Sequence, residues 1–173
     1  MTRFGYVMTT YFAMMATAAT GFIHPSARLV WNASASVPIG LYRAHPGAAI
    51  NVGDLVSVTP PSVLEAYLAK RHYLPLRVPL LKPVAAMAGQ TVCRFGSRVS
   101  VDGRHLGNAL ANDRRGRPLP RWAGCRRLGA DQVFLMSSAV RDSFDGRYFG
   151  PLPVSTVRAT LTPLWIAKPA LPH

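Results

Sequence analysis

The sequence predicts a mainly β domain with one short helix, preceded by a single N-terminal helical segment. Fifteen prolines and fourteen glycines among 173 residues interrupt regular structure often, which disfavours a helix bundle and suits short strands joined by turns. Hydrophobic residues make up 49% of the chain and charged residues 16%, which is enough apolar material for one core and argues against global disorder. The apolar runs after residue 23 are short, whereas residues 4–23 form one uninterrupted uncharged run.

The N-terminal run has the length of a membrane-spanning helix. Twenty residues without a charge follow Arg3, and at about 1.5 Å per residue such a helix covers a bilayer core of about 30 Å. Two interpretations stay open, namely an uncleaved anchor and an export signal cut after Ala16-Thr17-Ala18. A buried helix of a cytosolic protein fits less well, because long uniformly apolar runs are rare there. We therefore assign residues 1–23 to an anchor or export signal and residues 24–173 to a domain outside the cytoplasm.

The elements of that domain follow from local patterns. Ser62 and Glu65 have the spacing of a capping box, which predicts a helix through His72. Asp102-Gly103 predicts a hairpin turn. Residues 108–127 are rich in Arg, Pro and Gly without a hydrophobic period, so we expect a long exposed basic loop. Strands are predicted where β-prone residues lie between turn signals, at residues 41–43, 55–58, 84–92, 98–101, 133–136 and 154–164.

The two cysteines fit an oxidising compartment. Cys93 and Cys125 can form one disulfide, and a bridge over about thirty residues contributes a few kcal/mol in the chain-entropy account. The alternative is a pair of small buried hydrophobic residues. No CxxC motif and no histidine pair at i, i+4 spacing is present, so no metal site is predicted.

The chain is strongly basic. Twenty Lys and Arg face seven Asp and Glu, a formal charge of +13, which predicts an anionic partner such as nucleic acid, a lipid surface or an acidic protein. Nucleic acid is disfavoured, because basic and aromatic residues do not interleave on a recognisable platform and the N-terminal run predicts export. Only Lys70, Lys82 and Lys168 are lysines, so an amine that can lose its proton has three candidates.

Three segments carry candidate chemistry. In residues 34–40, Ser36 lies in a turn with Pro and Gly, where a hydroxyl can project, although many such turns have no further role. In residues 79–89, Lys82 is alone in an apolar run, and burial there would lower its pKa towards that of a base. A lysine whose stem packs while its ammonium reaches water is the plain alternative. Residues 141–151 contain two aspartates beside arginines, which by itself indicates a salt-bridged turn.

In this order the three segments resemble the type I signal peptidase family, and more narrowly its conjugative-transfer branch of TraF-type peptidases that mature pilin subunits. The resemblance covers nearly the whole chain and implies a signal-peptidase-like antiparallel β domain. It further implies Ser36 as the nucleophile and Lys82 as the general base. Ser143 is implied to orient that lysine. The segment 79–89 ends in Ala-Met-Ala-Gly, and the segment 141–151 reads Ser-Phe-Asp-Gly-Arg-Tyr-Phe-Gly-Pro from Ser143 onwards.

The resemblance also implies roles for three supporting residues. Asp145 and Arg147 would form a bracing ion pair, and the Ser34 hydroxyl would complete an oxyanion hole with the backbone N–H of Ser36. Cofactors are not expected.

The sequence departs from the family pattern at three places. Val37-Pro38 follows the serine where the general signal peptidases have Met, and this matches only the transfer branch. Ser137-Ser138 replaces the usual Gly-Asp-Asn, and Gly146 stands where Ser is common.

The residue types support the same chemistry independently. A serine hydroxyl is a weak nucleophile until a base removes its proton. Among the histidines only His45 lies near Ser36 in the sequence, and none accompanies the segment 141–151, although a Ser-His-Asp triad assembled in space remains an alternative. Lys82 has the most apolar sequence neighbours of the three lysines, so a neutral lysine is the favoured base.

The function implied is a serine endopeptidase that processes a pilin precursor through an acyl-enzyme. Either water or the pilin's own amino group would resolve that intermediate, giving a linear or a cyclic product, and the sequence selects neither. Small side chains are expected before the cut. The expected location is the bacterial inner membrane with the catalytic domain in the periplasm, or the periplasm alone if the N-terminal segment is cleaved.

Expected partners are the pilin precursor, inner membrane lipids and type IV secretion components. A different class of function stays open: a non-enzymatic periplasmic assembly component of a conjugation or secretion apparatus, holding lipid or an acidic partner through the basic residues 114–127.

Overall fold

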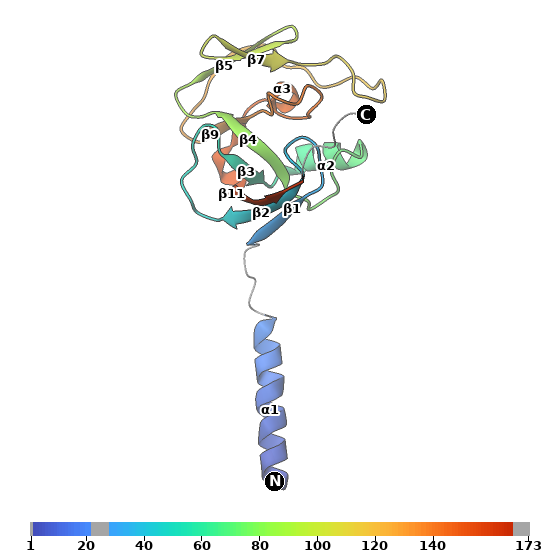
Figure 1. The fold of residues 1–173 in the computed structure, drawn as a ribbon, viewed down its shortest axis with the longest axis vertical. Coiled ribbons are helices and arrows are strands. Elements are labelled where there is room, and N and C mark those ends of the chain that lie inside the picture. Colours follow the sequence, from blue (N-terminus) through green and yellow to red (C-terminus); the bar gives the residue numbers. More distant parts are fainter. Residues whose placement is uncertain (1, 22–27, 168–173) are drawn as a thin grey trace.

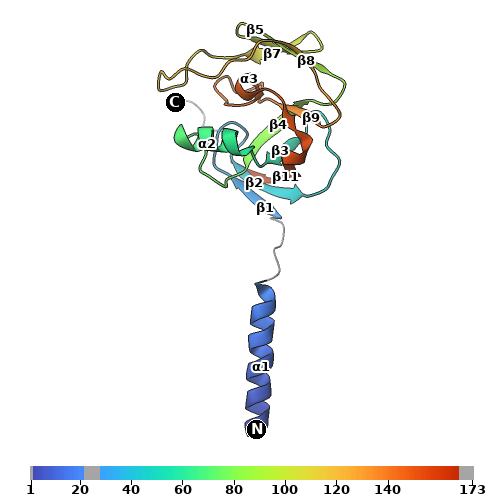
Figure 2. The same ribbon diagram turned by 180° about the vertical axis from the view of Figure 1, so that it is seen from behind.

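Two antiparallel sheets form the β domain of the computed structural model, which describes residues 2–21 and 28–167 (Figures 1 and 2). The mainly β prediction is confirmed. The larger sheet has the strand order β1-β2-β11-β3-β4-β9-β10, with bounds Leu29–Asn32, Gly40–His45, Val157–Ile166, Leu55–Val58, Leu80–Ala86, Gln132–Leu135 and Leu152–Pro153. The smaller sheet has the order β7-β6-β5-β8, with bounds Arg104–Asn108, Arg98–Val101, Thr91–Phe95 and Gly124–Arg127.

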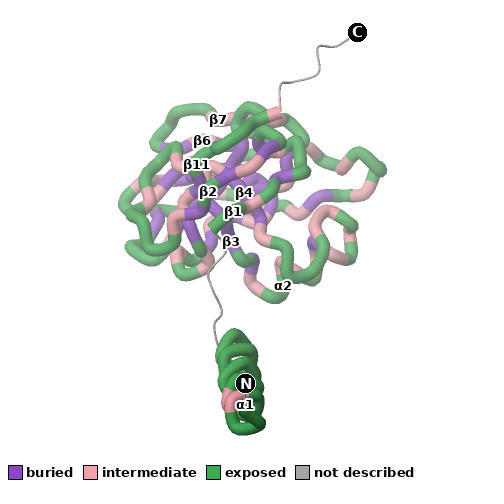
Figure 3. The backbone as a smooth tube through the Cα atoms, turned by 60° about the horizontal axis from the view of Figure 1, so that its bottom comes forward, coloured by how far each residue is buried: buried purple, intermediate pink, exposed green. Residues whose placement is uncertain are grey.

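The core lies on the central strands of the larger sheet. Val56, Val58 and Val84 are at most 2% exposed, and they pack with Val133 and Leu135 of β9. Branched side chains suit a pleated surface that is covered on one face. Figure 3 shows the buried positions concentrated in the middle of the domain. The candidate lysine therefore sits on one of the best-packed strands.

The strands predicted at 41–43 and 133–136 differ from β2 and β9 by one or two residues at their ends, and two further predicted strands differ by more. The single strand predicted at 84–92 is two strands, β4 and β5, separated by a turn in which Gly89 has a φ of +85°. The strand predicted at 154–164 starts at Val157, because residues 154–156 form a 3₁₀ turn. Strands β1 and β10 were not predicted, since each is short and acquires its regular form only by pairing with a neighbour.

The hairpin predicted at Asp102-Gly103 is confirmed. The two residues join β6 to β7 and have φ values of +47° and +80°. Positive φ at both central residues is the conformation that matches the twist of antiparallel strands, and Asp-Gly tolerates it well.

The predicted helix is α2, Ser62–Lys70, but its capping box is wrong. Pro61 occupies the N-cap position and no side chain caps the helix, so Ser62 is already inside the first turn. Glu65 instead accepts a hydrogen bond from the backbone N–H of Arg77 at 2.7 Å, which ties the following loop to the helix.

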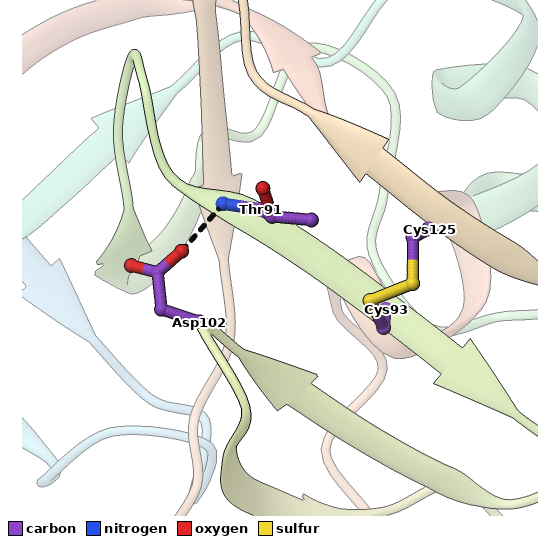
Figure 4. Close-up of a disulfide and its surroundings, with 4 residues drawn as sticks. All are labelled: Thr91, Cys93, Asp102 and Cys125. Atoms are coloured by element: carbon purple, nitrogen blue, oxygen red, sulfur yellow. Dashed lines mark hydrogen bonds between the residues drawn. A yellow bond between two sulfur atoms is a disulfide. The ribbon is translucent and has the colours of Figure 1, made fainter.

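The region predicted as one exposed loop, residues 108–127, is partly structured. Its last four residues form β8, which pairs with β5 and places Cys125 directly opposite Cys93. These two cysteines are joined by a disulfide (Figure 4). Ala109 and Leu119 are buried against Tyr148, so the remaining segment 109–123 folds back onto the domain rather than extending into solvent.

The N-terminal segment is helical from Arg3 to Thr20 (α1), and none of its residues is buried. Across residues 2–21 and 28–167, the structure has no helix with both the length and the apolar character needed to cross a membrane. The predicted boundary at residue 23 and the candidate Lys168 lie outside the described residues.

Candidate active site

Lys82 is buried in the middle of the larger sheet. It lies on β4, paired with Val56 of β3, and is only 2% exposed. Because side chains alternate along a strand, Lys82 shares its face with Leu80 and Val84, both of which belong to the core. Its Nζ donates a hydrogen bond to Ser143 Oγ at 2.7 Å. The ammonium nitrogen is therefore held inside the domain by one hydroxyl.

The protonation of Lys82 is governed mainly by this burial. Loss of solvent lowers its pKa from 10.5 to about 8, while the charge of Asp145 raises the pKa and that of Arg147 lowers it. Burial penalises the charged form of a lysine. At mildly alkaline pH a large fraction of Lys82 is consequently a neutral amine.

Asp145 and Arg147 form a buried ion pair that shapes the loop carrying Ser143. Both side chains are at most 1% exposed, and the Arg147 guanidinium donates to the two carboxylate oxygens at 2.9 and 2.8 Å. The same guanidinium reaches three loop carbonyls, those of Ser137, Val140 and Arg141. A pair with this many additional hydrogen bonds is well satisfied despite its burial. It fixes the loop that presents Ser143 to the lysine.

Gly146, between the two members of this pair, has no room for a side chain. A Cβ there would lie 2.6 Å from the carbonyl oxygen of Leu135 and 2.6 Å from the ring of Phe134. The one-turn helix α3, Gly146–Phe149, is thereby pressed against β9. This packing accounts for glycine at a position where serine is common.

Asn32 organises the segment that carries Ser36, and sequence reasoning missed it. It ends β1, is 4% exposed, and its Nδ2 lies within 3.0 Å of the carbonyl oxygens of Ser34, Val37 and Pro38. Its Oδ1 accepts from the backbone N–H of Ser34 at 3.0 Å. An asparagine at a strand end, directly before a turn, is a recognisable signal for such side-chain control of a loop.

Ser34 and Ser36 are neighbours in this loop, with 3.2 Å between their Oγ atoms. The Ser34 hydroxyl donates to Asn32 Oδ1 at 2.9 Å. A hydroxyl has one proton to donate, so Ser34 would have to rotate away from Asn32 before it donated to an oxyanion.

One cleft of about 990 Å³ brings the serines and the lysine together. Its lining includes Ser34, Ser36, Lys82 and Ser143, whereas Asp145 and Arg147 lie behind it. Within the described chain, no hydrogen bond joins Lys82 to Ser36. Catalytic hydrogen bonds are often long in the absence of substrate. A second cavity, of about 380 Å³, contains none of these residues.

The alternative Ser-His-Asp triad finds little support in the geometry. His45 bonds Thr162 Oγ1 at 2.9 Å and does not line the cleft. His72 does line it, but no hydrogen bond links it to a serine or carboxylate in the described part of the chain. The described residues contain no group of three or more His, Cys, Asp or Glu placed to hold a metal ion.

Comparison with known proteins places the chain in a family. The family model described as "Signal peptidase, peptidase S26" matches residues 1–165. A probable conjugal transfer protein TraF from Sinorhizobium fredii is 39% identical over 139 residues, covering 73% of this chain and 71% of that protein. The plasmid transfer protein TraF from Escherichia coli is 33% identical over 143 residues, covering 77% and 80%.

A crystal structure of a signal peptidase I from Enterococcus faecalis aligns with a TM-score of 0.39 and 15% identity, over 66% of this chain and 98% of that one. The family model and the sequence relatives together span most of the chain, including all three candidate segments. The chain belongs to the signal peptidase S26 family, in its TraF-type branch.

Proposed function

We propose that the chain is a membrane-associated serine endopeptidase, with Ser36 as nucleophile and Lys82 as general base, that processes a pilin precursor for conjugative transfer. The observation that carries the proposal is the buried Lys82, bonded to Ser143 in the wall of the cleft that Ser36 also lines. Membership of a peptidase family supports the chemistry, and the names of the TraF relatives support the role in transfer.

Lys82 suits the role of base because its surroundings favour the neutral amine. With a pKa of about 8, the neutral form is accessible near physiological pH. A neutral amine keeps two N–H groups and one lone pair. One N–H bonds Ser143 Oγ, and the lone pair is then free to take the proton of Ser36.

The first chemical step forms an acyl-enzyme. Ser36 Oγ attacks the scissile carbonyl carbon as its proton passes to Lys82 Nζ. The tetrahedral intermediate collapses when the C–N bond breaks, and the leaving amine takes the proton back from Lys82. The enzyme then carries the N-terminal part of the substrate as an ester on Ser36, and Lys82 is neutral again.

The oxyanion of the tetrahedral intermediate needs hydrogen-bond donors. The backbone N–H of Ser36 supplies one, and the Ser34 hydroxyl supplies a second once it turns from Asn32. Each such donor is worth about 3 kcal/mol of transition-state stabilisation in characterised enzymes. Asn32 then has a positioning role, because it holds the backbone from Ser34 to Pro38 in place.

The second step transfers the acyl group to water or to an amine. Neutral Lys82 deprotonates the incoming nucleophile, the ester bond breaks, and Ser36 recovers its proton. Water gives a linear product, whereas the amino group of the same pilin gives a head-to-tail cyclic product that is lighter by one water molecule.

We also propose that residues 1–23 serve as the membrane anchor or export signal, placing the catalytic domain in the periplasm. Large apolar side chains such as Phe4 and Phe12 are more than 60% exposed on α1. An export signal needs a shorter apolar stretch than a membrane span does. The Cys93–Cys125 disulfide fits an oxidising compartment. Inner membrane lipids and type IV secretion components are the further partners proposed.

The test is processing of a co-encoded pilin precursor by the full chain, followed by intact-mass spectrometry. The wild type should give a shortened linear or cyclic product, and Ser36→Ala should give none. Ser97→Ala, in the exposed β5–β6 turn, is a matched serine control that should behave like the wild type. Undiminished processing by Ser36→Ala would overturn the assignment of the nucleophile.

A further inference from the structure

The cleft that contains Ser36 and Lys82 is also lined by a basic region. Segment 109–123, the end of α2 and Asp142, next to Ser143 in the sequence, contribute it. No step of the proposed acyl transfer uses its charged side chains. The charged residues of this region are four arginines and two aspartates, namely Arg71, Arg114, Arg115, Arg117, Asp113 and Asp142. The positive charges exceed the negative ones by two.

Both aspartates are already paired with arginines. Asp113 accepts from Arg117 Nε and Nη2, each at 2.7 Å, and lies 3.9 Å from Arg71 Nη1. Asp142 pairs with Arg114. Arg115 is exposed and lines the cleft, and it has no carboxylate partner within residues 2–21 and 28–167. Among the four arginines of the region, Arg115 is the one without a carboxylate within 4 Å in the described residues, because Arg71 and Arg117 share Asp113.

The backbone around Arg115 is held in a fixed turn. Asp113 Oδ1 accepts from the backbone N–H groups of Arg115 and Arg117, both at 2.9 Å. Gly116, with a φ of +72°, completes the turn and donates to the Asp113 carbonyl at 2.9 Å. Tyr73 donates to Asp113 Oδ2 at 2.5 Å, which joins the turn to the segment after α2. A prearranged turn reduces the entropy lost when a ligand binds.

We propose that this region is a subsite for a carboxylate of the peptide substrate, with Arg115 as its main donor. The carboxylate is either an acidic side chain or the C-terminal carboxylate of the peptide. A guanidinium matches a carboxylate with two parallel hydrogen bonds, and the net charge of +13 favours the approach of an acidic segment. The inference rests on the proposed function, because it takes the cleft to hold a peptide.

Binding by an inactive full-length protein tests the subsite separately from catalysis. The protein is Ser36→Ala, and the probes are labelled, end-blocked, alanine-rich octapeptides with one Glu moved through each position, each matched by a Gln peptide. A second arm uses Gln peptides with a free C-terminal carboxylate. We expect at least one carboxylate peptide to bind about fivefold more tightly than its neutral match at low salt, with the difference shrinking at high salt.

The arginine is tested by adding Arg115→Gln to the Ser36→Ala protein. This change should remove the preference for the carboxylate, whereas Arg104→Gln should keep it. Arg104 is exposed on β7, does not line the cleft, and its loss lowers the net charge equally. Equal binding of all Glu and Gln peptides, or a preference that survives Arg115→Gln, overturns the proposal. Binding of the protein to anionic lipid vesicles is measured as well. If Arg115→Gln weakens only this vesicle binding and leaves peptide binding unchanged, the proposal is also overturned.

Cleavage of the same peptides by the protein with Ser36 intact separates the two proposals. Carboxylate-selective binding without any cleavage supports the subsite and contradicts the proposed peptidase. Cleavage at equal rates for the Glu and Gln peptides supports the peptidase and contradicts the subsite.

Discussion

Replacing Lys82 by Met should make the protein more stable at neutral pH while abolishing its proposed activity. Methionine keeps an unbranched apolar chain between Leu80 and Val84 but carries no ammonium. A buried charge is costly, and a group of similar shape without charge removes that cost. The pKa of Lys82 is lowered from 10.5 to about 8, which corresponds to about 3 kcal/mol at about 1.4 kcal/mol per pKa unit.

Part of this gain in the free energy of unfolding is offset by a lost interaction. The variant loses the hydrogen bond to Ser143 Oγ, worth about 1 kcal/mol. We therefore expect Lys82→Met to unfold with a free energy about 2 kcal/mol higher than the wild type at pH 6.

The pH dependence of the free energy of unfolding distinguishes removal of the buried charge from better packing as the cause of the higher stability. Between pH about 8 and 10.5 the unfolded wild type binds more protons at Lys82 than the folded form does, so its stability rises with pH. Below pH 8 both forms are protonated, and the full penalty is present. The advantage of Lys82→Met should therefore be constant below pH 7 and should shrink as the pH rises towards 10.

The assay is urea unfolding of both proteins at pH 6, 8 and 9.5, with unchanged m-values as the control for compactness. Taking the difference between the two proteins at each pH cancels the contributions of the titratable groups that both proteins contain. A variant that is less stable than the wild type at pH 6, or an advantage that does not vary with pH, would refute the reasoning.

Three further predictions concern the surroundings of the site. Gly146→Ser should lower stability by about 2 kcal/mol in urea unfolding, because the new side chain meets the carbonyl of Leu135; an unchanged midpoint would contradict this. Asn32→Ala should cost about 2 kcal/mol and lower kcat for precursor processing at least tenfold, since buried loop carbonyls lose their donor; full activity would show that the loop is fixed otherwise. Replacing Cys93 and Cys125 together by Ser should lower the unfolding free energy by about 3 kcal/mol, and equal stability would contradict a structural role for the bridge.

The sequence was informative where a local pattern determines the structure. The strand at 55–58 and the Asp102-Gly103 hairpin follow from residue preferences over a few positions, and both are present. For the isolated Lys82 in an apolar run, the sequence left open both a buried amine and a lysine whose ammonium reaches water. The 2% exposure of Lys82 in the structure shows that the side chain is buried.

Features that depend on distant contacts could not be predicted. Segment 109–123 is held against the domain by the buried Ala109 and Leu119, which pack on Tyr148, and by the ion pair between Arg117 and Asp113. No periodicity in the sequence predicts either contact. The hydrogen bonds from Asn32 to the Ser36 loop were also missed. An asparagine at a strand end is a signal for them only once residues 29–32 are known to be a strand, and that strand is defined by its pairing with β2. Pairing over a long sequence separation is set by tertiary packing rather than by local preference.

The most direct test of the neutral-lysine mechanism is the pH dependence of kcat/KM for cleavage of a precursor peptide with Ala before the cut. If Lys82 must be neutral to accept the proton of Ser36, kcat/KM should rise tenfold per pH unit on the acid side and level off above pH about 8. Lys82→Arg should be inactive throughout, because a guanidinium stays protonated. A value of kcat/KM that falls steadily above pH 7, or turnover by Lys82→Arg, would contradict the Ser36–Lys82 dyad.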